Sequence, residues 1–153
     1  SHATAAEVNA RLELLLAIRD KLSEVSVALN TIGSLRRQIE DWASRSSGKD
    51  GWDAIGSESE KLIARLAPIG TELTNTSIDG KPDDLARLDE KLMALVKAVD
   101  TTDGVPTQQS TELFGVLSAR VDAQLAHLRG IVDGDVPAFV ARLQGMEVPP
   151  VIV

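Results

Sequence analysis

The residues of this sequence that could do metal chemistry are few and far apart. Helical bundles hold di-iron centres with a Glu followed three residues later by a His on each of two helices, and that spacing does not occur here. The chain has two histidines, His2 and His127, and no cysteine. A typical imidazole or thiolate site needs several such ligands. We therefore expect no metal and no cofactor, and haem held by His127 with Met93 or Met146 is a weaker alternative.

Acidic residues gather in the middle of the chain, and paired carboxylates can perform general acid–base catalysis. The group consists of Glu58, Glu60, Asp83, Asp84, Asp89 and Glu90. Such pairs catalyse when burial or proximity separates their acidities, and the polar surroundings of these residues predict exposure. No Ser-His-Asp arrangement or Gly-rich phosphate loop is present, and Asp133-Gly134-Asp135 lacks the ligand spacing of a calcium loop. We expect no catalytic residue and no enzyme, with a cryptic hydrolase as the least favoured alternative.

Two tryptophans flank the first predicted loop. Trp42 and Trp52 make up half of the aromatic residues, since the chain has two Trp, two Phe and no Tyr. An aromatic pair at the end of a bundle can close the core or stack on a ligand. We expect Trp42 and Trp52 to cap the core, and ligand stacking is the alternative.

The elements that must position these residues are helices. Apolar residues recur every seven positions in two registers, Val8, Leu15, Leu22 and Leu29 in one and Ile18, Val25, Ile32 and Ile39 in the other. A 3.5-residue spacing keeps one stripe facing partner helices along its whole length. Thr4 and Glu7 have the spacing of a capping box. The sequence therefore predicts an unusually long first helix from about Thr4 to Ser44.

Three more helices are predicted, from about 50 or 52 to 75, from 83 or 84 to 102, and from 107 onward. Gly134 and Pro137 interrupt the fourth, and a last segment covers about 135–144. Short loops favour antiparallel neighbours. The sequence thus predicts an all-α, antiparallel up-down-up-down four-helix bundle over residues 4–147, with a long first helix and a kinked fourth helix. Residues 1–3 are expected to be a cloning scar, and residues 148–153 form an apolar C-terminal tail.

The predicted lengths leave the start of the first helix uncovered by the second and third helices. We expect residues 8–15 to pack mainly against Phe139 and Leu143, and the tail to emerge at that same end. The candidate interaction residues are therefore Leu12, Phe139, Val151 and Ile152.

Charge and hydropathy narrow the classes of partner. The net charge is −7 over 153 residues, whereas nucleic acids and anionic membrane surfaces bind concentrated basic patches. No apolar run is long enough to cross a bilayer, and no signal peptide is evident. We expect one domain that binds no nucleic acid and does not insert into membranes.

Several runs of the sequence carry a family resemblance: Leu16–Leu22, Ser34–Gln38, Leu88–Leu95, Asp103–Gln109, Phe114, Leu117–Leu125, Asp135–Phe139 and Val148–Val153. They resemble the helical C-terminal domain that follows the sortilin-like, BNR-repeat β-propeller in a family of large bacterial proteins. Many of those proteins are labelled glycosyl hydrolase or sialidase-like. Together they cover most of residues 12–153 and match best from about residue 85.

The chain departs from that family at three places. Asp89-Glu90 replaces an asparagine pair, Val140 replaces an asparagine, and the connection before the third helix is shorter. The resemblance implies export to the periplasm or the extracellular space, and it implies that any hydrolytic site would lie in the propeller.

These observations predict a non-catalytic accessory or interaction bundle that contacts its own propeller domain or another protein. A small-ligand sensor with a pocket near Pro68 or the tryptophans is the alternative from a different class. Self-association through residual heptad surface is a further alternative.

Overall fold

Helices account for nearly all of the residues that the structure, a computed structural model, describes: 4–74, 87–101 and 105–146. No strand occurs within these ranges, so the predicted all-α bundle is confirmed. The segments are α1 (Ala5–Ser46), α2 (Trp52–Leu73), α3 (Leu88–Asp100), α4 (Gln108–Gly130), the π-helical segment η1 (Ile131–Asp135) and α5 (Val136–Gly145).

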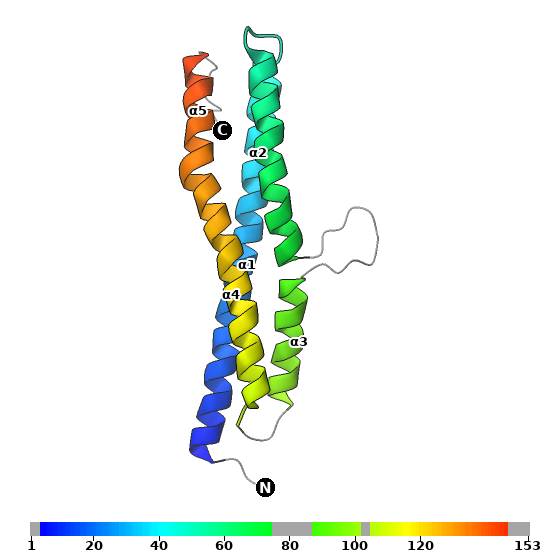
Figure 1. Ribbon diagram of the computed structural model, residues 1–153, viewed down its shortest axis with the longest axis vertical. Helices are drawn as coiled ribbons and strands as arrows, with labels where there is room; N and C mark the ends of the chain where they lie inside the picture. The colour runs from blue at the N-terminus through cyan, green and yellow to red at the C-terminus, as the bar shows by residue number, and fades with distance from the viewer. Residues whose placement is uncertain (1–3, 75–86, 102–104, 147–153) are drawn as a thin grey trace.

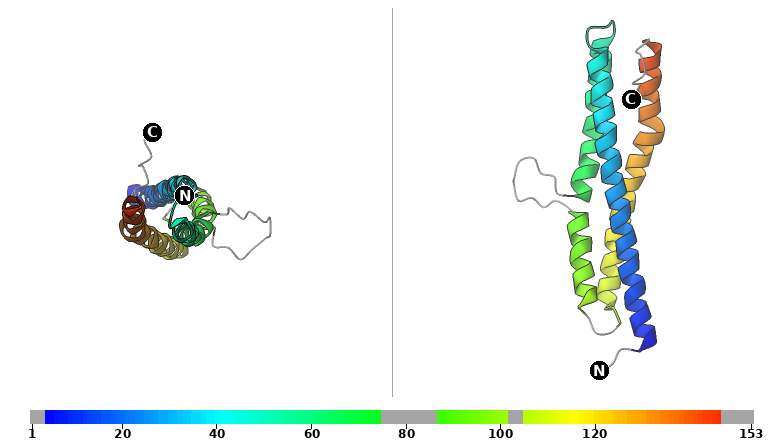
Figure 2. Two further views of the ribbon diagram at one scale, coloured as in Figure 1. Left: turned by 90° about the horizontal axis from the view of Figure 1, so that it is seen from above. Right: turned by 180° about the vertical axis from the view of Figure 1, so that it is seen from behind.

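Helices α2 and α3 lie end to end and run in the same direction beside α1 (Figure 1). The chain then returns along one column formed by α4, η1 and α5 (Figure 2). What we call the α2 half consists of α1, α2 and the returning column from the later part of α4 to α5, and the α3 half consists of α1, α3 and the first part of α4. This arrangement differs from the predicted up-down-up-down order. Neither α2 nor α3 alone is long enough to cover the heptad registers of α1. Stacked end to end, the two helices extend along both halves of α1.

Helix α1 has 42 residues and is about 63 Å long at about 1.5 Å per residue. Its predicted capping box is present: the Thr4 amide donates to Glu7 Oε2 at 2.9 Å, and the Glu7 amide donates to Thr4 Oγ1 at 3.2 Å. Three members of the isoleucine register, Ile18, Val25 and Ile39, are fully buried. The two heptad registers thus differ, because the register that begins at Val8 is only partly covered.

The junction of α2 and α3 is part of the core. Leu73 at the end of α2 and Leu88 at the start of α3 are both 0% exposed. Thr74 Oγ1 donates a hydrogen bond to Asp89 Oδ2 at 2.7 Å across the junction. The apolar interior therefore continues from one half of the bundle into the other.

The fourth predicted helix does not end at Gly134 and Pro137. Thr107 caps it as predicted, accepting from the Ser110 amide at 3.1 Å. At the predicted interruption the backbone forms the π-helical turn η1, and Pro137 lies in the first turn of α5, where its missing N–H is least costly. The helical column therefore continues to the last residues of α5.

The predicted contact of residues 8–15 with Phe139 and Leu143 is wrong. Phe139 packs on Trp42, with ring centroids 6.1 Å apart. Trp42 lies 30 residues beyond Leu12 on α1, or about 45 Å at about 1.5 Å per residue. Because α2 and α3 run in one direction, the chain crosses the bundle three times, and α5 finishes at the end where α1 finishes (Figure 1).

Candidate functional site

The residues considered for metal chemistry do not converge. His127 on α4 is exposed, and Met146 follows α5, 19 residues further along the same column. At about 1.5 Å per residue they are about 28 Å apart, too far to ligate one iron. Met93 on α3 is 55% exposed. No group of three or more His, Asp or Glu side chains suited to a metal ion occurs in the described parts of the chain.

The described carboxylates of the acidic group mostly join helices or cap them. Glu58 of α2 forms an ion pair with Arg142 of α5, Asp89 accepts from Thr74, and Glu90 lies 3.6 Å from Arg87. Glu60 is exposed, and Asp83 and Asp84 lie outside the described residues. These carboxylates are therefore not assembled as a catalytic pair.

Further ion pairs hold α2 against the returning column. Arg65 pairs with Asp135 of η1, and Arg120 of α4 donates to Glu72 at 2.8 Å. The acidic residues of this region therefore contribute to the packing of the helices.

The two tryptophans do not form a pair. The ring of Trp42 is tilted by 36° against Phe139, and the ring of Trp52 lies over Gly56, where an added Cβ would be 3.6 Å from Trp52 Cζ2. Both side chains are half-buried. Trp42 therefore contributes to the core at this end, together with Phe139.

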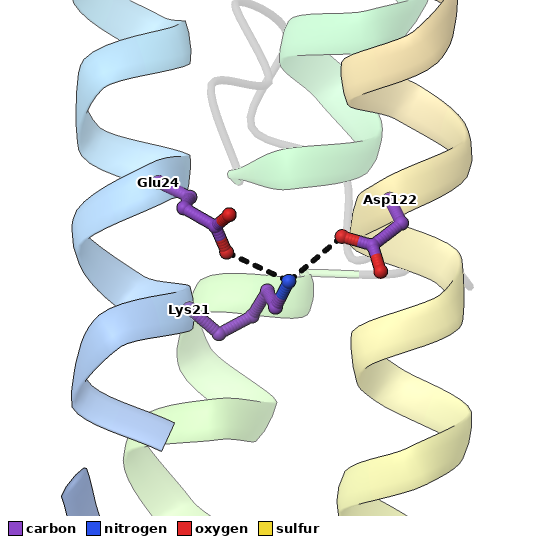
Figure 3. A network of polar contacts seen from close by, with 3 residues as sticks. All are labelled: Lys21, Glu24 and Asp122. Atoms are coloured by element: carbon purple, nitrogen blue, oxygen red, sulfur yellow. Dashed lines mark hydrogen bonds and ion pairs between the residues drawn. The ribbon is translucent and has the colours of Figure 1, made fainter. Parts of the chain in front are cut away.

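Lys21 is the centre of a polar network between α1 and α4 (Figure 3). Its Nζ lies 2.7 Å from Glu24 Oε2 and 2.7 Å from Asp122 Oδ1, and its side chain is only 14% exposed. Burial alone lowers the pKa of Lys21, but the hydrogen bonds and charges of Asp122 and Glu24 outweigh it and raise the pKa above its ordinary value. The network connects α1 to α4 through Lys21 and Asp122.

An open groove of about 800 Å³ lies between α2 and α4 and is called the α2–α4 groove. Pro68 of α2 and Gly130 of α4 both line it, and a Cβ on Gly130 would meet no atom within 4 Å. The groove is lined by Ala64, Arg65, Pro68, Ile69, Glu72, Gln124, Ala126, His127, Gly130 and Ile131. It lies where the sequence suggested a ligand pocket.

A second groove of about 580 Å³ lies between α1 and the column of α4 and η1 and is called the α1–α4 groove. Val27, which is 65% exposed, lies at its rim. The lining residues are Ser23, Glu24, Val27, Ala28, Thr31, Leu125, Leu128, Arg129, Val132 and Asp133. A hollow lined by Val27, Asn30, Thr31, Ser34, Leu35 and Gln38 continues it along α1.

A third apolar surface lies near the start of α1. Val8, Leu12 and Leu16 follow one another at four-residue spacing and are 41%, 51% and 45% exposed. We call these three residues the α1 stripe. Of the four predicted interaction residues, the structure exposes Leu12, buries Phe139 at the opposite end, and leaves Val151 and Ile152 outside the described residues.

The sequence analysis missed the α1–α4 groove, although a signal for it exists. Residues 25–35 contain no charged side chain, in a chain that is 25% charged. On a helix such a run leaves three turns without charge on any face. This signal marks the part of α1 beside the groove.

None of the described helices combines the length and the hydropathy that a membrane span requires. Comparison of the chain with protein family models, with characterised proteins and with solved structures found no match.

Proposed function

We propose that this chain is a non-catalytic interaction bundle that docks on another protein domain through the α1 stripe. The observation that carries the proposal is the exposure of Val8, Leu12 and Leu16 along one side of α1. Apolar residues at four-residue spacing on a helix are the anchors that helix-in-groove recognition uses. Burying such side chains stabilises a complex by about 25 cal/mol for each Å² of apolar surface removed from water.

Two further apolar side chains are exposed at the same end of the bundle. Leu113 and Val116 are 45% and 58% exposed, and they lie early in α4, which begins near the first residues of α1 (Figure 1). Phe139 and Trp42 are engaged with each other at the other end. The docking surface that we propose is therefore the end formed by the start of α1 and the start of α4.

The partner that we propose is a β-propeller domain of the same exported protein. Support for this partner comes from the runs that resemble propeller-associated bundles, which match best from about residue 85 onward. In this arrangement α1 would follow the propeller in the chain, so the α1 stripe would lie close to it. Any hydrolysis would then occur in the propeller, and the bundle would bind the propeller without catalysing a reaction.

Calorimetry with the propeller domain encoded by the parent gene tests the proposal. We expect binding of the full bundle, and we expect Leu12→Asp with Leu16→Asp to weaken it at least about 100-fold, since each buried anchor contributes about 1.5–3 kcal/mol. Val27→Asp is the matched control, because Val27 is an exposed apolar residue elsewhere on α1. A parent gene without a propeller would refute the partner, and equal affinity of the two variants would refute the surface.

A small-ligand role is the second candidate, favoured by the α2–α4 groove beside Pro68. Its apolar floor and the polar side chains of Arg65, Glu72 and His127 suit a small apolar molecule with one polar group. Screening of a fragment library by NMR should give shifts at Ile69 and Ile131. Gly130→Trp fills the groove and should abolish them, and shifts that persist in this variant would contradict the assignment.

A further inference from the structure

The charges that line the α1–α4 groove cancel, although the chain as a whole carries a net charge of −7. The charged side chains of its lining are Glu24, Arg129 and Asp133. Glu24 is neutralised by Lys21, whose Nζ lies 2.7 Å from Glu24 Oε2, and the charges of Arg129 and Asp133 have opposite signs. A neutral face is the part of an acidic chain that a second copy approaches with the least repulsion.

Arg129 and Asp133 are exposed at the groove and are four residues apart. No ion pair joins either side chain to another described residue, whereas Arg65 and Arg120 are both paired with carboxylates of another helix. We call Arg129 and Asp133 the groove charges. Two opposite charges of this kind can pair with their own equivalents when a second copy meets them in the opposite direction.

Beside the groove charges, α1 has an exposed surface without charge. Residues 25–35 contain no charged side chain and are called the uncharged run. The centre of the run is Asn30, and Val27 within it is 65% exposed and lines the groove. Arg36 and Arg37 follow the run, and neither lines the groove or its continuation along α1. The uncharged run therefore offers a neutral, partly apolar surface to another molecule.

The groove charges and the uncharged run have a common centre along the bundle. Lys21 of α1 lies 2.7 Å from Asp122 of α4 (Figure 3), and the two helices run in the same direction (Figure 1). Nine residues further along each helix lie Asn30, at the centre of the run, and Ile131, midway between the groove charges. A two-fold axis at this level, perpendicular to the helices, therefore turns the run onto itself and exchanges the positions of the two charges.

We propose that two copies of this chain form an antiparallel dimer about this axis, with their α1–α4 grooves face to face. Arg129 of each copy pairs with Asp133 of the other copy, and the two uncharged runs meet at the centre. The second copy thereby covers Val27, which no element of its own chain covers.

The size of this face predicts a weak dimer. From Ser23 to Gln38 the face is about 24 Å long, and two helices make it about 20 Å wide, which gives about 500 Å². Stable complexes bury about 800 Å² on each partner, so we expect a dissociation constant in the micromolar range. Leu16 lies seven residues before Ser23, about 10 Å outside the face, so the dimer leaves the α1 stripe free.

Charge reversal in the full chain, with sedimentation equilibrium as the measurement, tests the proposal. Arg129→Asp and Asp133→Arg each place like charges opposite one another. We therefore expect each variant alone to dimerise at least about ten-fold more weakly than the native chain. An equal mixture of the two variants restores two oppositely charged pairs, so we expect heterodimers with about the native affinity.

The two variants also separate local pairing from net charge. Arg129→Asp makes the chain more acidic and Asp133→Arg makes it less acidic, so general repulsion between copies would change the affinity in opposite directions. The proposal instead requires both variants to weaken the dimer. Glu60→Arg is the matched control, because it changes the charge as Asp133→Arg does at an exposed position of α2 outside the face. This control should keep the native affinity.

Each other outcome contradicts the proposal. A native chain that stays monomeric up to about 1 mM, beyond the micromolar range expected, would refute the dimer. Native affinity in both single variants would place the contact on another face. A mixture no tighter than either variant alone would refute the antiparallel pairing of the groove charges.

Val27→Asp separates this proposal from docking through the α1 stripe. The substitution puts two carboxylates into the centre of the dimer, so we expect dimerisation to weaken at least about ten-fold. Binding of the propeller domain through Leu12 and Leu16 should be unchanged in the same variant. Native dimer affinity in Val27→Asp would contradict the dimer alone, so the two proposals can fail separately.

Discussion

At the scale of single residues, Lys21 carries the clearest electrostatic signal of the described chain. The side chain is 14% exposed, whereas its partners Glu24 and Asp122 are 48% and 58% exposed. Solvent screens partners of that exposure, so the pair contributes at most about 1 kcal/mol to stability. The pair also favours one axial register of α1 relative to α4, because Lys21 and Asp122 come from different helices (Figure 3).

The raised pKa of Lys21 predicts how this contribution depends on pH. Because the folded-state pKa exceeds the ordinary value of 10.5, the contribution is complete below that value and is lost as pH rises through the folded-state pKa. We expect Lys21→Met to be less stable than the native chain by up to about 1 kcal/mol at neutral pH. Urea unfolding at neutral pH and above pH 11 should show this difference disappearing at alkaline pH.

Lys61→Met is the control, because Lys61 is exposed on α2. A stability difference for Lys21→Met that stayed constant with pH would show that packing of the aliphatic stem, rather than the charge, is responsible.

At the scale of elements, the π-helical turn η1 decides which side of α5 faces the core. A π-helical turn carries one residue more than the matching α-helical turn. Its residues Ile131–Asp135 precede Phe139 and Leu143, which are 4% and 5% exposed. Without the extra residue, α5 would be rotated by about 100° and both side chains would leave the interior.

Deletion of Gly134 tests this role. We expect the loss of more than about 4 kcal/mol of stability, since two large apolar side chains lose their contacts. The urea midpoint from circular dichroism and the fluorescence of Trp42 would measure it. Gly134→Ala keeps the residue count, and its Cβ would meet no atom within 4 Å. It should change stability by no more than about 1 kcal/mol, and a deletion variant as stable as Gly134→Ala would contradict the role of η1.

At the scale of the whole molecule, two three-helix halves share α1 and one continuous core. Leu73 and Leu88 close the junction of the halves with no exposed surface. Helix α4 contacts both α3 and α2, and its Arg120 pairs with Glu72 near the end of α2. Shared helices and a shared core favour unfolding in a single step.

Leu92→Ala in the α3 half tests this cooperativity, because Leu92 is 0% exposed and both tryptophans lie in the α2 half. We expect a loss of about 2–5 kcal/mol, with the transitions seen by tryptophan fluorescence and by circular dichroism moving together. Met93→Ala, at a position 55% exposed on the same helix, should cost less than about 1 kcal/mol. A fluorescence transition that stayed in place while the dichroism transition split would show that the halves unfold separately.

Local features of the bundle could be predicted from the sequence because they depend on neighbours in the chain. The capping box of Thr4 and Glu7, the cap at Thr107 and the buried isoleucine register follow from spacings of three and seven residues. Trp42 and Trp52 were both expected to cap the core; Trp42 packs there against Phe139, whereas Trp52 lies over Gly56 of its own helix.

The path of the chain depended on tertiary structure. A loop between two helices is compatible with reversal or with continuation, and the choice is made by how much of α1 each alternative buries. Continuation from α2 into α3 covers α1 along both halves and leaves Phe139 about 45 Å from Leu12. The sequence by itself therefore determined which faces are apolar, whereas only packing decided which faces meet. The α1 stripe stays exposed near one end of the protein, and the α1–α4 groove stays open in the other half.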